Sequence, residues 1–246
     1  AGTENTQITW MDVKIDNHAI TPRNGKTVEL NALWYNALKI MARLAEKYEN
    51  KQLCRKYLEM AEKTKKSFDE KFYNEEKHCL YDVLGDSKVR PNQLFALSLS
   101  HPIVDNAEIA EQVLNTVENK LLNKYGLKTL SSDEDGYVEV YEGSAYKRDL
   151  SYHQGITWPW LLGLYYDALK NTMIIEKNRT KRQELEEKIT KLVYTTKETF
   201  KAEMFERSSI GTISEIYDST EPYEERGAFA QAWSVAEIFR IVLNKR

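Results

Sequence analysis

The sequence predicts an all-α fold of consecutive antiparallel helical hairpins, closed into an α/α toroid. One observation is that segments apolar on most sides alternate with segments that carry a narrow apolar stripe and a dense Lys/Glu face. A helix apolar all round is buried, whereas one with a single stripe lies on the outside. The other is that short links follow the apolar segments and long, dissimilar links precede them. An open solenoid has short, regular connections, so these links favour the toroid.

The first four helical segments alternate in this way. Residues Val28–Lys47 are apolar at intervals of three and four, as a buried inner helix requires, and Lys51–Phe72 combine one apolar stripe with a charged face. Pro91–Leu99 form a short apolar segment that begins with proline, a residue favoured in the first helical turn. Asp105–Lys124 repeat the outer, amphipathic pattern.

The last three segments continue the alternation. Trp158–Asn171 are apolar on most sides, Thr180–Glu206 carry a long Lys/Glu face, and Ala228–Asn244 are again apolar. The signal for strands is weak: Tyr137–Tyr141 alternate for a few residues, enough for a small hairpin at most. A closed ring of six hairpins has twelve helices, so about five helices would lie upstream of Ala1. The opening residues, Ala1–Thr6, lack both a methionine and the features of a signal peptide, which predicts a fragment of a longer chain.

Composition excludes several classes of partner. The net charge of −3 arises from a nearly even mix of signs, which predicts no nucleic-acid surface, and no apolar run is long enough to span a membrane. The two cysteines, Cys54 and Cys79, lie in unlike contexts and are expected to be free thiols in a reducing, cytoplasmic compartment. Incomplete closure of the ring would leave the inner helices with exposed apolar flanks, so we expect self-association or dependence on an upstream segment.

The long links are rich in Trp, Arg, Asn, Gln, His and carboxylates. All of them precede inner helices and would open onto one mouth, where a rigid scaffold positions functional residues. Aromatic faces pack on sugar rings, planar polar groups bond hydroxyls and carboxylates handle protons, so this composition indicates a carbohydrate site. The links comprise Thr9–Asp12, Arg90–Gln93, Tyr152–Pro159, Ser214–Asp218 and Ala230–Ser234.

Other chemistries lack their motifs. The four histidines show no HExxH spacing and no CxxC pair occurs, so no catalytic metal is expected. The phosphate-cradling and nucleotide-binding glycine motifs and the GxSxG nucleophile motif are absent as well. The sequence therefore predicts a carbohydrate enzyme without a cofactor.

Several motifs together resemble the glucosidase domain of prokaryotic-type glycogen debranching enzymes. They follow the order of that family along nearly the whole chain: Thr9–Asp12, Thr21–Lys26, Val28–Asn36, Arg90–Gln93, Gly126–Leu130, Tyr152–Pro159, Ser214–Ile216 and Gln231–Ser234. The resemblance implies a six-hairpin toroid, of which residues 1–246 would be the C-terminal part, and amylo-α-1,6-glucosidase activity on glycogen or limit dextrin. It also implies inversion, with Asp12 as the general acid and Glu215 as the general base.

Alternatives to these roles remain open. Glu29, at the start of an inner helix, is a rival for the acid, although a carboxylate there also suits the helix dipole. A general acid must hold a proton near neutral pH, so Asp12 is expected to lie against an apolar wall such as Trp10 or beside a like charge. A non-catalytic helical carbohydrate-binding or scaffold module is the alternative function.

The residues predicted to contact substrate are Trp10, Glu29, Trp34, Arg90, Asn92, His153, Gln154, Trp158 and Gln231. Core packing is as good an interpretation as sugar stacking for Trp34 and Trp158, and it is favoured for Trp160 and Trp233. The Arg90-Pro91 step also suits a helix start.

Overall fold

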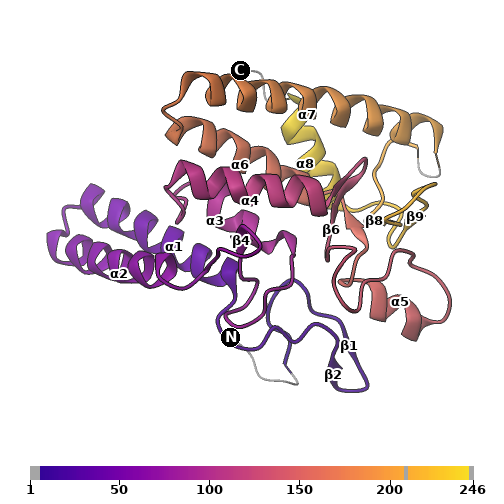
Figure 1. The fold of residues 1–246 in the computed structure, drawn as a ribbon, viewed down its shortest axis with the longest axis horizontal. Coiled ribbons are helices and arrows are strands. Elements are labelled where there is room, and N and C mark those ends of the chain that lie inside the picture. The colour runs from indigo at the N-terminus through magenta and orange to yellow at the C-terminus, as the bar shows by residue number, and fades with distance from the viewer. Residues whose placement is uncertain (1–5, 208–209, 244–246) are drawn as a thin grey trace.

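The computed structural model describes residues 6–207 and 210–243, and within them the chain is mainly helical. In Figure 1 the successive helices lie side by side, with the strands and long loops gathered at one end of them. The helices are α1 Val28–Lys47, α2 Lys51–Asp69, α3 Phe95–Ser98 after a 3₁₀ turn at Pro91–Leu94, α4 Ala107–Lys120, α5 Ala145–Ser151, α6 Leu161–Ile175, α7 Arg179–Glu206 and α8 Ala232–Leu243.

The seven predicted helical segments are present, with shifted ends. Asparagine side chains fix three of the starts: Asn50, Asn106 and Asn178 each accept a hydrogen bond from a backbone N–H in the first turn of α2, α4 and α7. Such caps satisfy donors that a helix start leaves without partners, and they mark where the outer helices begin. The predicted last helical residue, Asn244, lies outside the described residues.

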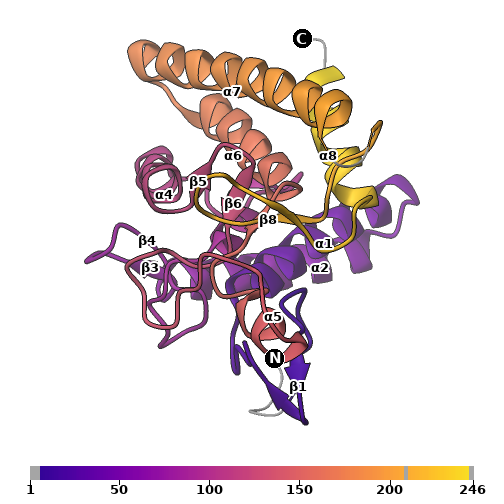
Figure 2. The same cartoon turned by 90° about the vertical axis from the view of Figure 1, so that its right-hand side faces the viewer.

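The inner helices contact one another in chain order. α1 packs on α3, α3 on α6, and α6 on α8, while the outer helices α2 and α7 pack on α1 and α6. The burial pattern matches this arrangement, because α6 has buried residues over most of its surface whereas α2 buries only Ala61 and Phe68. The arrangement agrees with the predicted alternation from α1 to α7, whereas α8, predicted as an inner helix, buries only Ser234, Ile238 and Ile241. Figure 2, a view from the end that carries the loops, shows α4 and α7 on the outer side of α6.

The β structure differs from the prediction. A five-stranded antiparallel sheet joins segments far apart in sequence, and residues 137–141 form no strand. The sheet is made of β5 Leu122–Asn123, β6 Gly126–Lys128, β7 Thr157–Trp158, β8 Ile216–Tyr217 and β9 Glu225–Arg226, and two small hairpins are made of β1 Lys14–Ile15 with β2 His18–Ala19 and β3 Tyr73–Asn74 with β4 Cys79–Leu80. Strands of two or three residues are too short to show a period in sequence, so the pattern could not reveal them.

The sheet determines which loops meet. Thr157 of β7 pairs with Tyr217 of β8, so the segment around His153 and Trp158 is joined to the segment that follows Glu215. The side chains of Trp158 and Tyr217 are themselves almost completely buried. The sheet therefore holds two of the predicted site loops against each other.

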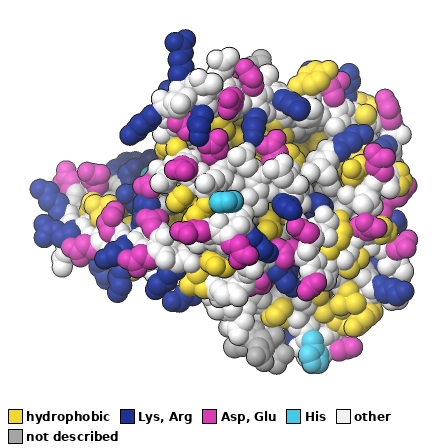
Figure 3. Space-filling view, in the orientation of Figure 1, with side chains coloured by type: hydrophobic (Ala, Val, Ile, Leu, Met, Phe, Trp, Pro, Cys, Tyr) yellow, Lys and Arg dark blue, Asp and Glu magenta, His cyan; other side chains and the backbone are white. Residues whose placement is uncertain are grey.

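Two helices keep exposed apolar stripes. On α1 the stripe consists of Leu33, Trp34, Met41 and Leu44, and on α8 it consists of Phe239 and Leu243. Their spacing places each set along one side of its helix. These apolar stripes contrast with the rest of the surface of these helices. In Figure 3, Lys/Arg and Asp/Glu side chains are mixed over the end of the molecule formed by α1 and α2. None of the described helices has the length and apolar character needed to cross a bilayer.

Candidate active site

An aromatic cluster forms the centre of the loop-bearing end. Trp10 contacts the rings of His153, Trp158 and Trp160 edge-on at centroid distances of 5.1, 5.5 and 5.1 Å. Trp233 stacks on Trp160 at 5.1 Å. The loops that carry Trp10 and Trp158 therefore lie on one face, as predicted. Trp160 and Trp233, interpreted from sequence as core, are both part of this cluster, and Trp160 also packs against the hydrophobic core.

Glu215 is held in place by three donors. Its carboxylate accepts hydrogen bonds from the Tyr152 hydroxyl at 2.5 Å, from the Ala228 backbone N–H at 2.9 Å and from the Gln231 amide at 3.3 Å. Gly227 has a φ of +68°, and a Cβ there would overlap the carboxylate, so this turn needs glycine. Burial and the nearby Glu215 charge raise the pKa of Tyr152, which therefore stays a donor.

Glu215 also lines a cavity of about 560 Å³ at this end of the molecule. Tyr141 and the basic side chains of Arg148 and Arg226 share the lining with it. The cavity thus offers an aromatic ring and hydrogen-bond donors beside a fixed carboxylate. Neither arginine was singled out from the sequence, where nothing distinguishes them from other charged loop residues.

The surroundings of Asp12 differ from those expected of a general acid. Its side chain is 68% exposed, and Nε2 of His153 lies 3.8 Å from Oδ1. The His153 interaction lowers the pKa of Asp12, so the free protein holds this carboxyl ionised. The expectation of an apolar wall or like charge that keeps Asp12 protonated is therefore wrong for the free protein, because a histidine faces it and water reaches it.

Asp12 and Glu215 are linked through two consecutive residues. His153 faces Asp12, Tyr152 donates to Glu215, and the two rings lie 4.8 Å apart. Trp158 Nε1 donates to the Tyr152 carbonyl at 3.1 Å, which holds this dipeptide against the cluster. Two carboxylates from opposite ends of the chain thus lie on either side of one dipeptide.

A buried ionic network holds the Asp12 loop from beneath. Arg23 donates to both oxygens of Glu29, at 2.5 and 2.6 Å, and to both oxygens of Asp82, at 2.5 and 3.0 Å. Asn92 donates to Asp82 at 2.8 Å and accepts from Trp10 Nε1 at 2.6 Å. The network therefore runs from the start of α1 to the loop that carries Asp12. Arg23 and Asp82 were missed as site residues because they are 59 residues apart and share no motif.

This network determines what Glu29 can do. Burial raises the pKa of Glu29, as an acid would require, but its side chain is only 3% exposed. Both oxygens accept from Arg23, so neither is free to meet a glycosidic oxygen. The geometry favours a structural role for Glu29. The same holds for Asn92, whose side chain is completely buried.

Arg90 is likewise engaged inside the protein. Its guanidinium donates to the backbone carbonyls of Thr129 and His153 at 3.1 and 2.7 Å and to the Gln154 side chain at 2.6 Å. Arg90 thus holds the loop of His153, and Pro91 begins the 3₁₀ turn that follows it. Gln154 and Gln231 are partly exposed. Trp34 is 51% exposed on the α1 stripe.

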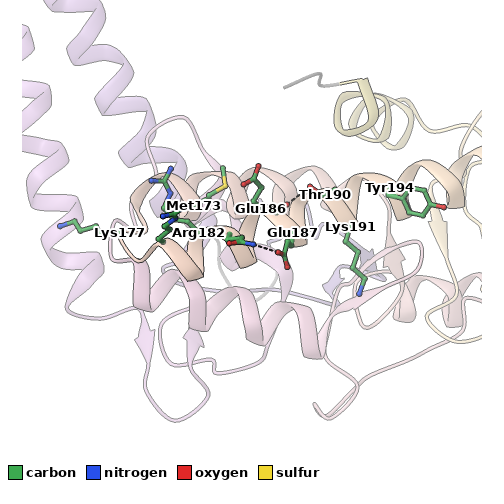
Figure 4. A pocket seen from close by; sticks show the side chains of 10 residues that line it. Met173, Lys177, Arg182, Glu186, Glu187, Thr190, Lys191 and Tyr194 are labelled. Carbon is green, nitrogen blue, oxygen red and sulfur yellow. Dashed lines mark hydrogen bonds between the residues drawn. The ribbon is translucent and has the colours of Figure 1, made fainter.

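A larger cavity lies elsewhere. A groove of about 1220 Å³ runs along α7 and the end of α6, lined by Met173, Lys177, Arg182 and Tyr194 among others. Figure 4 shows these side chains on the outward side of the helices, and the aromatic cluster contributes no residue to it. Among the described residues, no three His, Cys, Asp or Glu side chains gather in a way that could hold a metal ion.

Two comparisons with known proteins bear on this site. A family model described as amylo-alpha-1,6-glucosidase matches residues 1–240. A solved structure titled sialidase matches 96% of this chain with a TM-score of 0.66 at 14% sequence identity, and this chain spans 22% of that structure's length. At this identity the second likeness indicates a shared fold.

Proposed function

The chain belongs to the amylo-alpha-1,6-glucosidase family, and from this premise we propose that it hydrolyses α-1,6-glucosidic branch linkages in glycogen and limit dextrin. The observation that carries the proposal is the pair of carboxylates, Asp12 and Glu215, on either side of Tyr152 and His153 at the mouth formed by the long loops. Two carboxylates that flank a bond, with aromatic and amide side chains around them, suit glycoside hydrolysis.

We propose inversion, with Asp12 as acid and Glu215 as base. In an inverting enzyme the acid protonates the leaving oxygen while the base activates water on the opposite face of the sugar, so the carboxyls stand roughly 6.5–9.5 Å apart. The intervening Tyr152–His153 dipeptide supports such a spacing, because the two carboxylates face different side chains of it. The three donors to Glu215 would keep it oriented toward the water.

The substrate would lie along the exposed edge of the aromatic cluster. Gln154 and Gln231 offer amide groups there, and Trp10 offers a ring surface. Arg148 and Arg226 line the adjoining cavity and would bond sugar hydroxyls beyond Glu215. The fully buried Arg90 and Asn92 would act on substrate only by holding these loops.

We further propose that the helices form an arc of an (α/α)6 toroid and that residues 1–246 are the C-terminal part of a glucosidase domain. The inner helices contact one another in chain order, as in a ring, and the apolar stripes of α1 and α8 mark the first and last inner helices of the arc. Further hairpins would cover these stripes. The free thiols of Cys54 and Cys79 are consistent with a cytoplasmic location.

The test is release of glucose from a singly branched α-1,6-linked oligosaccharide. Asp12→Asn and Glu215→Gln are each expected to reduce kcat by at least about 10²-fold while binding survives, because each removes one proton-transfer group. Asp16→Asn, an exposed aspartate four residues from Asp12, is the matched control and should leave kcat unchanged.

Stereochemistry separates the mechanisms. NMR should detect β-glucose as the first product from the α-linked substrate, and α-glucose first would contradict the inverting pair. If Glu29→Gln abolished turnover while Asp12→Asn retained it, the acid would be misassigned. Substrate binding without any release of glucose would favour the carbohydrate-binding alternative.

A further inference from the structure

His153 is buried beside Asp12 without any conventional partner for its ring. The side chain is 1% exposed, which leaves no surface for the sugar contact predicted from sequence. Neither ring nitrogen makes a hydrogen bond within the described part of the chain, although Nε2 faces Asp12 Oδ1 at 3.8 Å. A buried histidine normally satisfies at least one nitrogen, because an unpaired buried polar group is costly. Its placement therefore needs a functional reason.

The rings around His153 are suited to a cation. Trp158 stacks on the imidazole at 5.4 Å with an interplanar angle of 17°, while Tyr152 lies at 4.8 Å. The face of a tryptophan attracts a positive charge through its quadrupole. The charges of Asp12 and Glu215 favour an imidazolium, whereas burial and Arg90 oppose it, and together these effects lower the pKa of His153. The neutral imidazole is therefore favoured near neutral pH, and the ring takes up its proton at more acidic pH.

Asp12, for its part, lacks the proton that its proposed role requires. At that more acidic pH, a carboxylate and an imidazole that face each other carry a single proton between them, either as imidazolium and carboxylate or as imidazole and carboxylic acid. A sugar bound over the exposed Asp12 would remove its water, and loss of water disfavours the charged form of a carboxyl. Substrate binding would therefore move the shared proton onto Asp12.

We infer that His153 is the positioning residue that stores the acid's proton and returns it to Asp12 when substrate binds; this inference rests on the proposed function. The proton leaves Nε2 for Oδ1 and then passes to the glycosidic oxygen as the bond to C1 breaks. Water adds to C1 and its proton goes to Glu215, which releases it to solvent. A solvent proton reaches Nε2 through the exposed Asp12 carboxylate, so the cycle consumes only water.

Kinetics give one test. In His153→Gln, the alkaline limb of the kcat/KM profile should move to lower pH by about one unit, because the limb then reports Asp12 alone. KM should change little, since the ring is not exposed to substrate. His18→Gln, the same exchange at an exposed histidine, should leave the profile unchanged. An alkaline limb of His153→Gln that stays in place or moves to higher pH would overturn the inference.

A second test needs no turnover. Proton NMR of the histidine rings, with the His153 signal identified by its loss in His153→Gln, should show that Asp12→Asn lowers the pKa of His153 while His18 is unaffected. If His153→Gln does not fold, the remaining three histidine variants identify the signal by elimination. An unchanged His153 titration in Asp12→Asn refutes the shared proton. Coupling between the two residues in a protein that releases no glucose would instead refute the proposed function and leave the pair intact.

Discussion

Glu203 and Glu225 form a second carboxylate pair, in which Glu203 is buried and Glu225, on β9, is partly exposed. Glu203, near the end of α7, accepts a hydrogen bond from Tyr217 at 2.8 Å, and Arg207 lies 3.6 Å from Glu203 and 2.8 Å from Glu225. One arginine faces two carboxylates there. Burial, together with the neighbouring Glu225, raises the pKa of Glu203 to about 7.

This shift predicts a dependence of stability on pH. A carboxyl whose pKa is higher in the folded state binds its proton more tightly there, so its contribution is full below the ordinary pKa and is lost as pH rises through about 7. The free energy of unfolding should therefore fall by up to about 3 kcal/mol between pH 5 and 8 through this group. Urea unfolding of Glu203→Gln, whose amide still accepts from Tyr217, should show a much weaker dependence.

The control for Glu203 is Glu206→Gln on the same helix, where the side chain is exposed. It should reproduce the wild-type dependence on pH. Parallel curves for the wild type and Glu203→Gln would show that the carboxyl at position 203 is ionised throughout this range.

At the scale of elements, the loop that leads into β7 depends on a close approach of two backbone segments. Gly155 has a φ of +143°, and a Cβ there would overlap the Val138 carbonyl oxygen. Its N–H donates to Thr129 at 2.9 Å, and the neighbouring Gln154 carbonyl accepts from the Val138 N–H at 2.7 Å. The position of His153 thus depends on a glycine two residues away.

Gly155→Ala should consequently destabilise the protein more than an alanine at an unconfined glycine. Gly85 also has a positive φ, of +92°, but a Cβ there meets nothing within 4 Å, so Gly85→Ala carries only the backbone strain of about 1–3 kcal/mol. Gly155→Ala should lose at least about 1–3 kcal/mol more through overpacking. Thermal unfolding of the two variants measures the difference, and equal losses would mean that the segment at residue 138 moves aside freely.

Elements also show what sequence can and cannot reveal. The long periodic helices α1, α2 and α7 were predicted to within a few residues, because each repeats its pattern over many turns. The seven-residue α5 was not predicted, since its Lys, Arg and Asp leave no apolar stripe and its start depends on a Ser144 cap. Motifs indicated Asp12 and Glu215, but the partnership of Asp82 with Arg23 arises only from folding.

At the scale of the whole molecule, the stripes of α1 and α8 are the largest departure from a self-sufficient surface. Six large apolar side chains, such as Trp34 at 51% and Leu243 at 64% exposure, line two helices that are both inner in character. Contiguous exposed apolar surface in a water-soluble protein marks a place of association. In the proposed arc, the two helices that carry these stripes are the first and the last inner helix.

The chain as given should accordingly self-associate. Sedimentation velocity over a range of concentrations is expected to show dimers or larger species, and the double variant Met41→Lys/Phe239→Lys should shift them toward monomer. Phe205→Lys, which removes an apolar side chain 67% exposed on α7 and outside both stripes, is the control. A wild-type chain that stays monomeric at high concentration would contradict this expectation.

The Tyr152–His153 dipeptide has a consequence for how this fold can be altered. Because one peptide bond joins the partner of Glu215 to the partner of Asp12, the distance between the two carboxylates is tied to the length of this loop. An insertion or deletion between Arg148 and Thr157 would displace both at once. In directed evolution or loop grafting, the segment from Arg148 to Thr157 should accept new side chains only at constant length.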